Sequence, residues 1–413
     1  MRISSASAAC AAILLIGSSL AASAQTPAPP DPGITTTIPE LTLGNTIVQL
    51  VRPVGATHVG EALGLATKLS VATAPFGSSS GGFLIKLDPS TGLQVRTATT
   101  FGPSFAERAL TSGEGSVSLG VSYLYSNLEH LDDLSLTSLQ VRSATGALAS
   151  NSRSGTANLT LSSKTIVMAA RMGVTDKLDL GVYIPLVALK LNGTSSLVDG
   201  TNKTLLVGTG TDLAKGVGDV AGLVKYRFFS FGNDLLDPGG LAVMATLRFP
   251  TGDKENLRGL GVTRTALTFI ASSGQGRFRP HANGGFEYWS DGVSVTSDNP
   301  PNSTVTAQHQ IQYAAGFELE AAPKVTVLLD LIGANILGGG RMGFKPDATL
   351  PAGISSSSSL VALPEGISKL SLAPGLKANI KAKLLFTVNA LIALHDNGLH
   401  ATVTPMAGLD LTF

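Results

Sequence analysis

Apolar and polar residues alternate at every second position along twelve segments of about ten residues, and this alternation constrains the fold more than any other feature. In 116–126, Val117, Leu119 and Val121 share one strand face, while Ser116 and Ser118 share the other. Ten residues at about 3.3 Å each, tilted by about 45°, cover roughly 24 Å, the height of the apolar band of a transmembrane barrel. The segments are 116–126, 164–174, 178–188, 219–229, 241–249, 263–271, 278–289, 310–320, 325–334, 370–379, 384–394 and 401–413.

The composition favours strands over helices as the membrane-crossing elements. The mean hydropathy is +0.28 and only 14% of residues are charged, yet no apolar run long enough for a helical span follows the first residues. In a transmembrane barrel the apolar residues are diluted to every second position. We therefore predict an all-β fold: a transmembrane antiparallel β-barrel of about twelve strands in the bacterial outer membrane, with outer-membrane lipid against its apolar faces.

The connections between the segments indicate an orientation. Links that follow odd-numbered segments are mostly long, such as 127–163 and 189–218, whereas links that follow even-numbered segments are mostly short, such as 175–177. Barrels have short periplasmic turns and longer outside loops. The C-terminus is therefore expected in the periplasm, with Phe413 ending the closing strand and marking the chain for the outer-membrane barrel assembly machinery.

The first residues predict an exported protein. Arg2 precedes a short apolar stretch, and small residues at 22–24 provide a cleavage site, so 1–24 reads as a signal peptide. The lone Cys10 lies before the apolar run instead of after it, which disfavours lipidation. The mature chain then has no cysteine, which excludes disulfides and thiolate chemistry.

Residues 25–113 form a leader or plug segment ahead of a barrel domain at 114–413. A weak helical spacing covers 61–72, and 83–87 and 93–97 flank a turn at 88–92 and read as a hairpin. The segment is interpreted as a plug in the lumen or as a periplasmic segment. Alternatively, the hairpin adds two strands and makes a barrel of fourteen.

Charged and polar residues on the inward faces are the candidate functional residues. Rings of such side chains set selectivity in channels, although internal ion pairs that fill a narrow lumen would produce the same pattern. The lumen-lining candidates are Lys225, Arg227, Arg248, Arg264, Arg279, His281, Glu287, Glu318, Glu320 and Asp330.

Other motifs are weak. Residues 216–221 (GVGDVA) match a loose dinucleotide fingerprint, but a strand follows them where the fingerprint needs a helix. His395, Asp396 and His400 could attract a metal, but a turn between strands favours plain solvated polarity. With 29 basic and 28 acidic residues there is no basic stripe for nucleic acid. No cofactor, metal site or catalytic set is predicted, so the protein is not expected to be an enzyme.

Three stretches carry a resemblance to a known family. They are FGPSFAERAL at 101–110 followed by 113–125, LRFPTGD at 247–253 with 257–261, and YAAGF at 313–317. They resemble the outer-membrane transporter-like family linked to meta-pathway phenol degradation, which is distantly similar to long-chain fatty acid and aromatic hydrocarbon transporters. The resemblance covers most of 53–413 and implies a barrel with passive uptake of hydrophobic or aromatic compounds. It places no catalytic or ligand-binding motif residue by residue.

Three functions remain open from the sequence. The first is an outer-membrane channel or transporter for passive uptake of small hydrophobic or aromatic solutes. The second is a general hydrophilic porin, which the balanced charge allows but the narrow bore of twelve strands disfavours. The third is a structural outer-membrane barrel without transport.

Overall fold

The computed structural model describes residues 42–54, 58–77, 85–87, 94–96, 100–145, 154–198, 203–232, 239–274, 276–298, 300–347, 356–381 and 383–413. The chain divides into two units, 1–41 and 42–413, and every described residue belongs to the second. The expected signal peptide and Cys10 lie outside the described residues.

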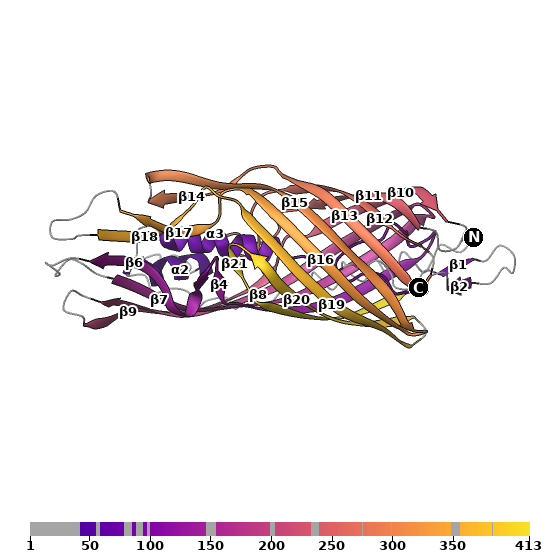
Figure 1. Cartoon of the computed structure of the whole chain (residues 1–413), viewed down its shortest axis with the longest axis horizontal. Coiled ribbons are helices and arrows are strands. Elements are labelled where there is room, and N and C mark those ends of the chain that lie inside the picture. The colour runs from indigo at the N-terminus through magenta and orange to yellow at the C-terminus, as the bar shows by residue number, and fades with distance from the viewer. Residues whose placement is uncertain are drawn as a thin grey trace, which may run out of the picture. The chain divides into compact units, whose positions relative to one another are not determined.

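Twelve antiparallel strands close into a barrel (Figure 1). The last barrel strand pairs with the first, with Leu411 opposite Leu119 and Leu409 opposite Val121. All twelve predicted segments and the closing role of the C-terminal strand are therefore confirmed. In order around the barrel the strands are β3 (Val117–Leu128), β7 (Ser154–Thr175), β8 (Leu178–Val198), β10 (Ala221–Phe231), β11 (Gly239–Arg248), β12 (Arg264–Ser272), β13 (Phe278–Trp289), β15 (Pro301–Ala322), β16 (Val325–Gly338), β19 (Ile367–Lys381), β20 (Leu384–Asp396) and β22 (Val403–Thr412).

The apolar faces of these strands point away from the lumen. In β12, Leu267 and Phe269 are 48% and 60% exposed, whereas the alternate residues Ala266 and Thr268 are buried. Aromatic residues near strand ends are exposed in the same way, namely Tyr226, Phe228, Phe249, Phe278, Tyr288 and Phe413. An apolar exterior on a closed sheet leaves no unpaired strand edge in lipid, which is the condition for β-structure to cross a membrane. The protein is accordingly an outer-membrane barrel.

Several strands continue well beyond the membrane band. β7 and β15 each have 22 residues and β8 has 21, about twice what a tilted membrane strand needs. The prediction of loops at 127–163 and 189–218 was wrong in this respect, because much of each range is strand. The extension is completed by β6 (Leu139–Thr145), β9 (Thr204–Val217), β14 (Val293–Asp298), β17 (Met342–Pro346) and β18 (Ser356–Ala362).

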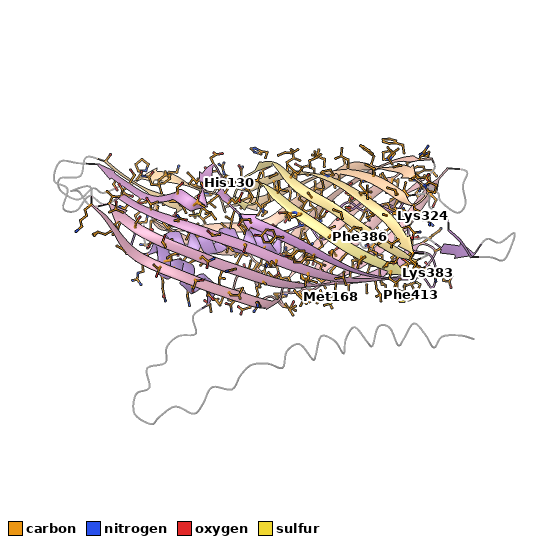
Figure 2. All side chains as sticks on the ribbon, turned by 90° about the horizontal axis from the view of Figure 1, so that it is seen from below. His130, Met168, Lys324, Lys383, Phe386 and Phe413 are labelled. Carbon is orange, nitrogen blue, oxygen red and sulfur yellow. The ribbon has the colours of Figure 1, made fainter. Side chains whose placement is uncertain are left out.

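The opposite end of the barrel carries short turns. Lys324 and Lys383 belong to two of these turns and lie at the same end as Phe413 (Figure 2). Short turns and the C-terminus at one end, with long extensions at the other, agree with the predicted orientation in which this end faces the periplasm.

The predicted hairpin forms but does not join the barrel. β1 (Ile85–Leu87) and β2 (Gln94–Arg96) pair only with each other in a two-stranded sheet. The alternative of fourteen barrel strands was therefore wrong. A second small sheet contains β4 (His130–Leu131), β5 (Leu134–Ser135) and β21 (Leu399–His400), and a 3-10 turn, η1 (Leu136–Ser138), follows it.

Two helices pack within the extended end of the barrel. α3 (Val59–Ala72) corresponds to the weak helix expected at 61–72, whereas α2 (Leu43–Val51) was not predicted. Both helices contribute to a large apolar core with inward residues of the extension, such as Leu189, Leu191 and Leu360. Figure 1 shows α2 and α3 among β6, β17 and β18. Within the described part of the chain, neither helix has the length and apolar character of a membrane-spanning helix.

Candidate functional site

Residues 100–112, here called the inner segment, cross the lumen near the periplasmic ends of the strands. Their backbone is held by side chains that the barrel points inward. Asp330 of β16 accepts hydrogen bonds from the amides of Ser104 and Phe105 at 3.2 and 3.1 Å. Glu318 of β15 accepts one from Gly102 at 3.0 Å. The carboxylates of two neighbouring strands therefore fix the first half of the segment.

The second half of the inner segment is held in the same way from other strands. The Lys225 ammonium of β10 donates to the carbonyls of Arg108 and Leu110 at 3.2 and 3.0 Å. Asp179 of β8 accepts from the Ser112 amide at 3.0 Å. Ser272 of β12, Asn283 of β13 and Lys377 of β19 also bond the backbone of this segment. Side chains from seven strands thus hydrogen-bond to the backbone of a segment that has no regular secondary structure of its own.

Glu107 is the charged centre of this contact. Its carboxylate accepts two hydrogen bonds from the Arg171 guanidinium, at 2.7 and 3.0 Å, and lies 3.4 Å from the Lys225 ammonium. Lys225 also lies 3.8 Å from Asp179. The Arg171 and Lys225 side chains are fully buried, so each depends on these partners to offset its lost hydration.

A second charged cluster lies further toward the outer end. Glu287 of β13 accepts from Arg264 at 3.3 Å and from the Trp289 indole at 2.9 Å, and it lies 3.3 Å from Nε of Arg248. Arg264 also donates to Asp219 at 3.2 Å and to the carbonyl of Ala72, the last residue of α3. This cluster ties the barrel wall to the helix pair.

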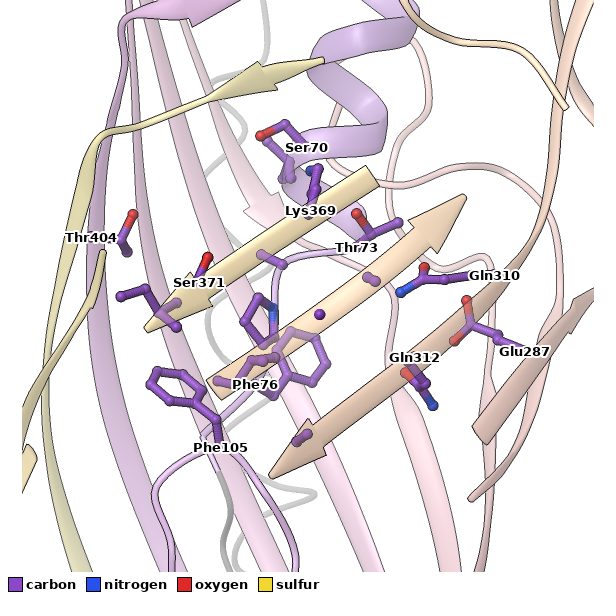
Figure 3. A pocket seen from close by; sticks show the side chains of 18 of the residues that line it. Ser70, Thr73, Phe76, Phe105, Glu287, Gln310, Gln312, Lys369, Ser371 and Thr404 are labelled. Carbon is purple, nitrogen blue, oxygen red and sulfur yellow. The ribbon is translucent and has the colours of Figure 1, made fainter. Parts of the chain in front are cut away.

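Between these two layers lies a cavity of about 270 Å³. One boundary is the end of α3 and the residues after it, including Ser70, Thr73 and Phe76, and another is formed by Phe105 and Glu107 of the inner segment. Figure 3 shows Phe76 and Phe105 in one part of the cavity and Glu287, Gln310 and Gln312 in another. Apolar wall residues of the barrel include Leu124, Leu223, Met244, Ile332 and Leu391. The cavity thus combines an aromatic and aliphatic side with a polar side.

The structure brings several of the lumen-lining candidates together. Arg248, Arg264 and Glu287 share the outer cluster, and Glu318, His281 and Asp330 form another group, with the His281 ring 2.7 Å from Asp330. Lys225 joins the group around Glu107.

Three candidates lie closer to the periplasmic turns. Arg227 donates to the Asp176 carbonyl at 3.0 Å, and Arg279 donates to the Gly276 carbonyl. Glu320 is half-buried at the end of β15, where its backbone pairs with Arg277. Whether any of the candidates contacts a solute stays a prediction.

Sequence reasoning missed the partners of these charges. Glu107 belongs to the stretch that carried the family resemblance, but nothing in that stretch signals that it enters the lumen. Arg171, Asp219 and Lys377 lie at inward positions of the alternating pattern, and that parity is the signal by which the sequence could have found them. Other missed residues are Arg108 and Asp179.

The remaining motifs fall in plain structural positions. Gly216 and Val217 end β9 and Ala221 begins β10, with no helix within the described residues 203–232. His400 stacks on His130 with ring centroids 5.5 Å apart, so it contacts a histidine of the small sheet.

Two charged groups outside the membrane strands have shifted pKa values. Burial lowers the pKa of the Lys68 ammonium in α3, and the nearby Glu255 carboxylate offsets only part of that shift. Burial by itself would raise the pKa of Asp253, but hydrogen bonds donated by Asn256 and Glu255 outweigh burial and hold that pKa below its usual value. Both groups lie where the loop after β11 meets the helices.

Solved structures that are similar to this chain are outer-membrane barrels. An outer-membrane channel from Pseudomonas putida F1 is 14% identical, with 74% of this chain and 98% of that chain covered and a TM-score of 0.45. The Ralstonia pickettii toluene transporter TbuX is 14% identical, covering 73% and 90%, with a TM-score of 0.29. A Pseudomonas aeruginosa FadL homologue is 12% identical, covering 83% and 98%, with a TM-score of 0.31.

These structures are of the kind that the resemblance in the sequence implied, namely outer-membrane channels and transporters. No model of a known protein family matches the sequence, and no curated protein matches it. Similarities this low do not transfer a function, so the function has to follow from the chain's own residues.

Proposed function

We propose that this protein is a passive outer-membrane transporter for small hydrophobic or aromatic solutes, and that residues 42–54, 58–77 and 100–112 form its plug. The observation that carries the proposal is the cavity of about 270 Å³ between the end of α3 and the inner segment. A cavity of about 150 Å³ lined by apolar side chains is enough to bind benzene. The present cavity therefore has room for a single substituted ring.

The filled lumen argues against a general hydrophilic porin. On the outer side, α2 and α3 pack into an apolar core with the strand extensions. On the periplasmic side, the inner segment is bonded to seven strands. Among the described residues, two packed layers therefore lie across the lumen, and we propose that a solute passes when one of them moves.

The inner segment is better suited to move than the helix pair. It is held by hydrogen bonds and ion pairs to side chains, which can exchange for water one after another, whereas the helices bury Leu63, Leu65 and Leu69 in a continuous apolar core. We propose that a solute enters from outside, rests in the cavity, and leaves toward the periplasm when the inner segment detaches. Net flux then follows the concentration gradient, with no cofactor and no chemical step.

A reversible disulfide tests this path directly. Ala109 in the inner segment donates its amide to Ser272 of β12 at 2.9 Å, and the sequence has a single cysteine, Cys10, within the predicted signal peptide. The double variant A109C/S272C should form a bridge between the segment and the wall. We expect the oxidised protein in proteoliposomes to lose uptake of a small aromatic probe such as toluene, and reduction to restore uptake.

The single variants A109C and S272C are the matched controls, since neither can form the bridge and both should transport under oxidising conditions. Planar bilayers complete the test. Large, steady conductance of the unmodified protein would identify a hydrophilic porin. Uptake that is absent from every variant, oxidised or reduced, would favour a structural barrel. Equal uptake by the oxidised and reduced double variant would show that the inner segment is not the exit.

A further inference from the structure

The guanidinium of Arg248 is the least satisfied charged group on the cavity wall. Among the described residues, neither Nε nor Nη1 of Arg248 has a hydrogen-bond partner, although both atoms are buried. Its nearest carboxylate oxygen, Oε2 of Glu287, lies 3.3 Å from Nε but does not make a hydrogen bond with it. Glu287 instead accepts from Arg264 and Trp289. Buried N–H donors without acceptors are costly, so a bound molecule with an acceptor at this point would gain a hydrogen bond from Arg248.

The surroundings of Arg248 indicate what shape a bound molecule with such an acceptor would have. The guanidinium stands 4.6 Å from the centre of the Phe76 ring, and Phe76 in turn lies 5.8 Å from the ring of Tyr183. Phe105 and Leu223 line the same cavity. A flat apolar body fits against these rings, and a polar substituent of that body would meet the free donors of Arg248.

We infer that the cavity binds monoaromatic molecules that carry an oxygen acceptor, with Arg248 donating to that oxygen and Phe76 packing against the ring. The inference rests on the proposed function, whose transported class it narrows. The charge around the site allows both a neutral and an anionic acceptor, because Arg248 and Arg264 face Glu287 and Asp219. An alcohol or a carboxylate oxygen can each accept from the guanidinium, and the carboxylate forms the stronger, charge-assisted bond.

The protein contains its own reporter for this site. Trp289 is the single tryptophan of the sequence, it is buried, and its indole donates to the Glu287 carboxylate on the cavity wall. Fluorescence of Trp289 in detergent-solubilised protein therefore reports occupancy without any label. Toluene, benzyl alcohol and benzoate form a graded series, since each is a benzene ring with one attached carbon; benzyl alcohol adds a hydroxyl group and benzoate a charged carboxylate.

The test is a fluorescence titration of these three molecules against the unmodified protein and the variant R248M. Methionine keeps the apolar stem and removes the donors, and Glu287 keeps Arg264 and Trp289 as partners, so the fold is expected to persist. We expect R248M to raise the Kd of benzyl alcohol and of benzoate roughly tenfold or more and to leave the Kd of toluene unchanged. The exposed Arg52 after α2 supplies the control R52M, which should change none of the three.

The inference is overturned if R248M lowers the affinity for toluene as much as the affinity for the oxygenated molecules, or if it changes none of these affinities. It is also overturned if benzyl alcohol and benzoate fail to bind the unmodified protein. Any of these three results leaves the proposed transport function intact, as long as the disulfide between positions 109 and 272 still controls uptake. Conversely, oxygenated ligands that bind normally while the disulfide has no effect on uptake would refute the proposed exit but not this site.

Discussion

At the scale of single residues, the lumen is organised by charges that are buried in pairs and in small groups. Glu107 is 8% exposed and faces two fully buried cations. A buried carboxylate between two cations differs from a surface ion pair, because removing it leaves Arg171 without this carboxylate and Lys225 with only the more distant Asp179. Glu107 therefore helps to hold the inner segment, together with the hydrogen bonds that the barrel strands make to its backbone.

Replacing that carboxylate should release the segment. In E107Q, Arg171 loses its carboxylate and Lys225 keeps only the more distant Asp179, a change of the kind that costs about 3–5 kcal/mol. Opening of the segment should then become more than roughly 100-fold more frequent. The measurement is the rate at which a maleimide labels a cysteine at the buried position Ala109, with and without E107Q.

The variant E320Q, in a half-buried glutamate at the periplasmic end of β15, is the control and should leave the labelling rate unchanged. Identical labelling rates with and without E107Q would mean that the carboxylate does not hold the segment closed.

At the scale of elements, single strands change character along their length. In β8, Leu180 is exposed to lipid while Asp179 is buried, but further along Lys190 is exposed and Leu189 and Leu191 are buried. The backbone alternation never breaks; the environment outside changes from lipid to water, and the lumen changes from polar groups to the helix pair. A reading that expects apolar residues outward everywhere ends the strand at this inversion, which explains why 189–198 was expected to be a loop.

The start of α2 depends on a loop far away in the sequence. Asn256 accepts from the Leu43 amide and the Glu255 carbonyl accepts from the Gly44 amide, so the loop after β11 satisfies helix donors that otherwise lack partners. Asp253 shapes that loop by accepting from the amides of Glu255 and Asn256. The loop therefore acts as an external cap on the plug.

We expect D253A to loosen this cap at neutral pH. Loss of a cap costs about 1 kcal/mol, which should speed amide exchange in Leu43–Val51 roughly fivefold. The folded-state pKa of Asp253 is lowered, so its contribution is fully present above the unfolded pKa of about 3.9 and is lost as the pH falls through the folded value. Hydrogen exchange monitored by mass spectrometry at pH 7 and below pH 4 measures both effects.

The unmodified protein should approach D253A only at the lower pH. D291A, in another exposed outer loop, is the matched control and should exchange like the unmodified protein at pH 7. Unchanged exchange in D253A at pH 7 would contradict the capping role.

At the scale of the whole molecule, the barrel meets three different surroundings. Its middle band faces lipid with Leu267 and Phe269, its long end faces water outside the cell and an apolar plug inside, and its short end carries the turns. The position of the lipid band follows from where exposed apolar residues end, and it makes the cost of an outward charge depend on depth.

Arginine substitutions measure that depth dependence. L267R lies in the middle of β12 and should cost about 2–4 kcal/mol in the free energy of unfolding, whereas F278R at the periplasmic start of β13 should cost about 0–1 kcal/mol. Reversible denaturant unfolding in lipid vesicles, followed by Trp289 fluorescence, gives both values. Equal costs at the two positions would contradict the assignment of this face to lipid.

The amino-acid sequence by itself determined the barrel, its twelve strands and its closing strand, because strand alternation is a local property that does not depend on knowing the partners. Turn length, which is also local, predicts the orientation in the membrane. The sequence also placed charges such as Arg264 and Glu287 on inward faces, since strand parity decides the side. Tertiary structure alone decided which charges meet, how the inner segment crosses the lumen and where the cavity lies. Glu107 and Arg171 are 64 positions apart and Leu43 and Asn256 are 213 apart; contacts over such separations form only when the closed barrel brings remote residues together.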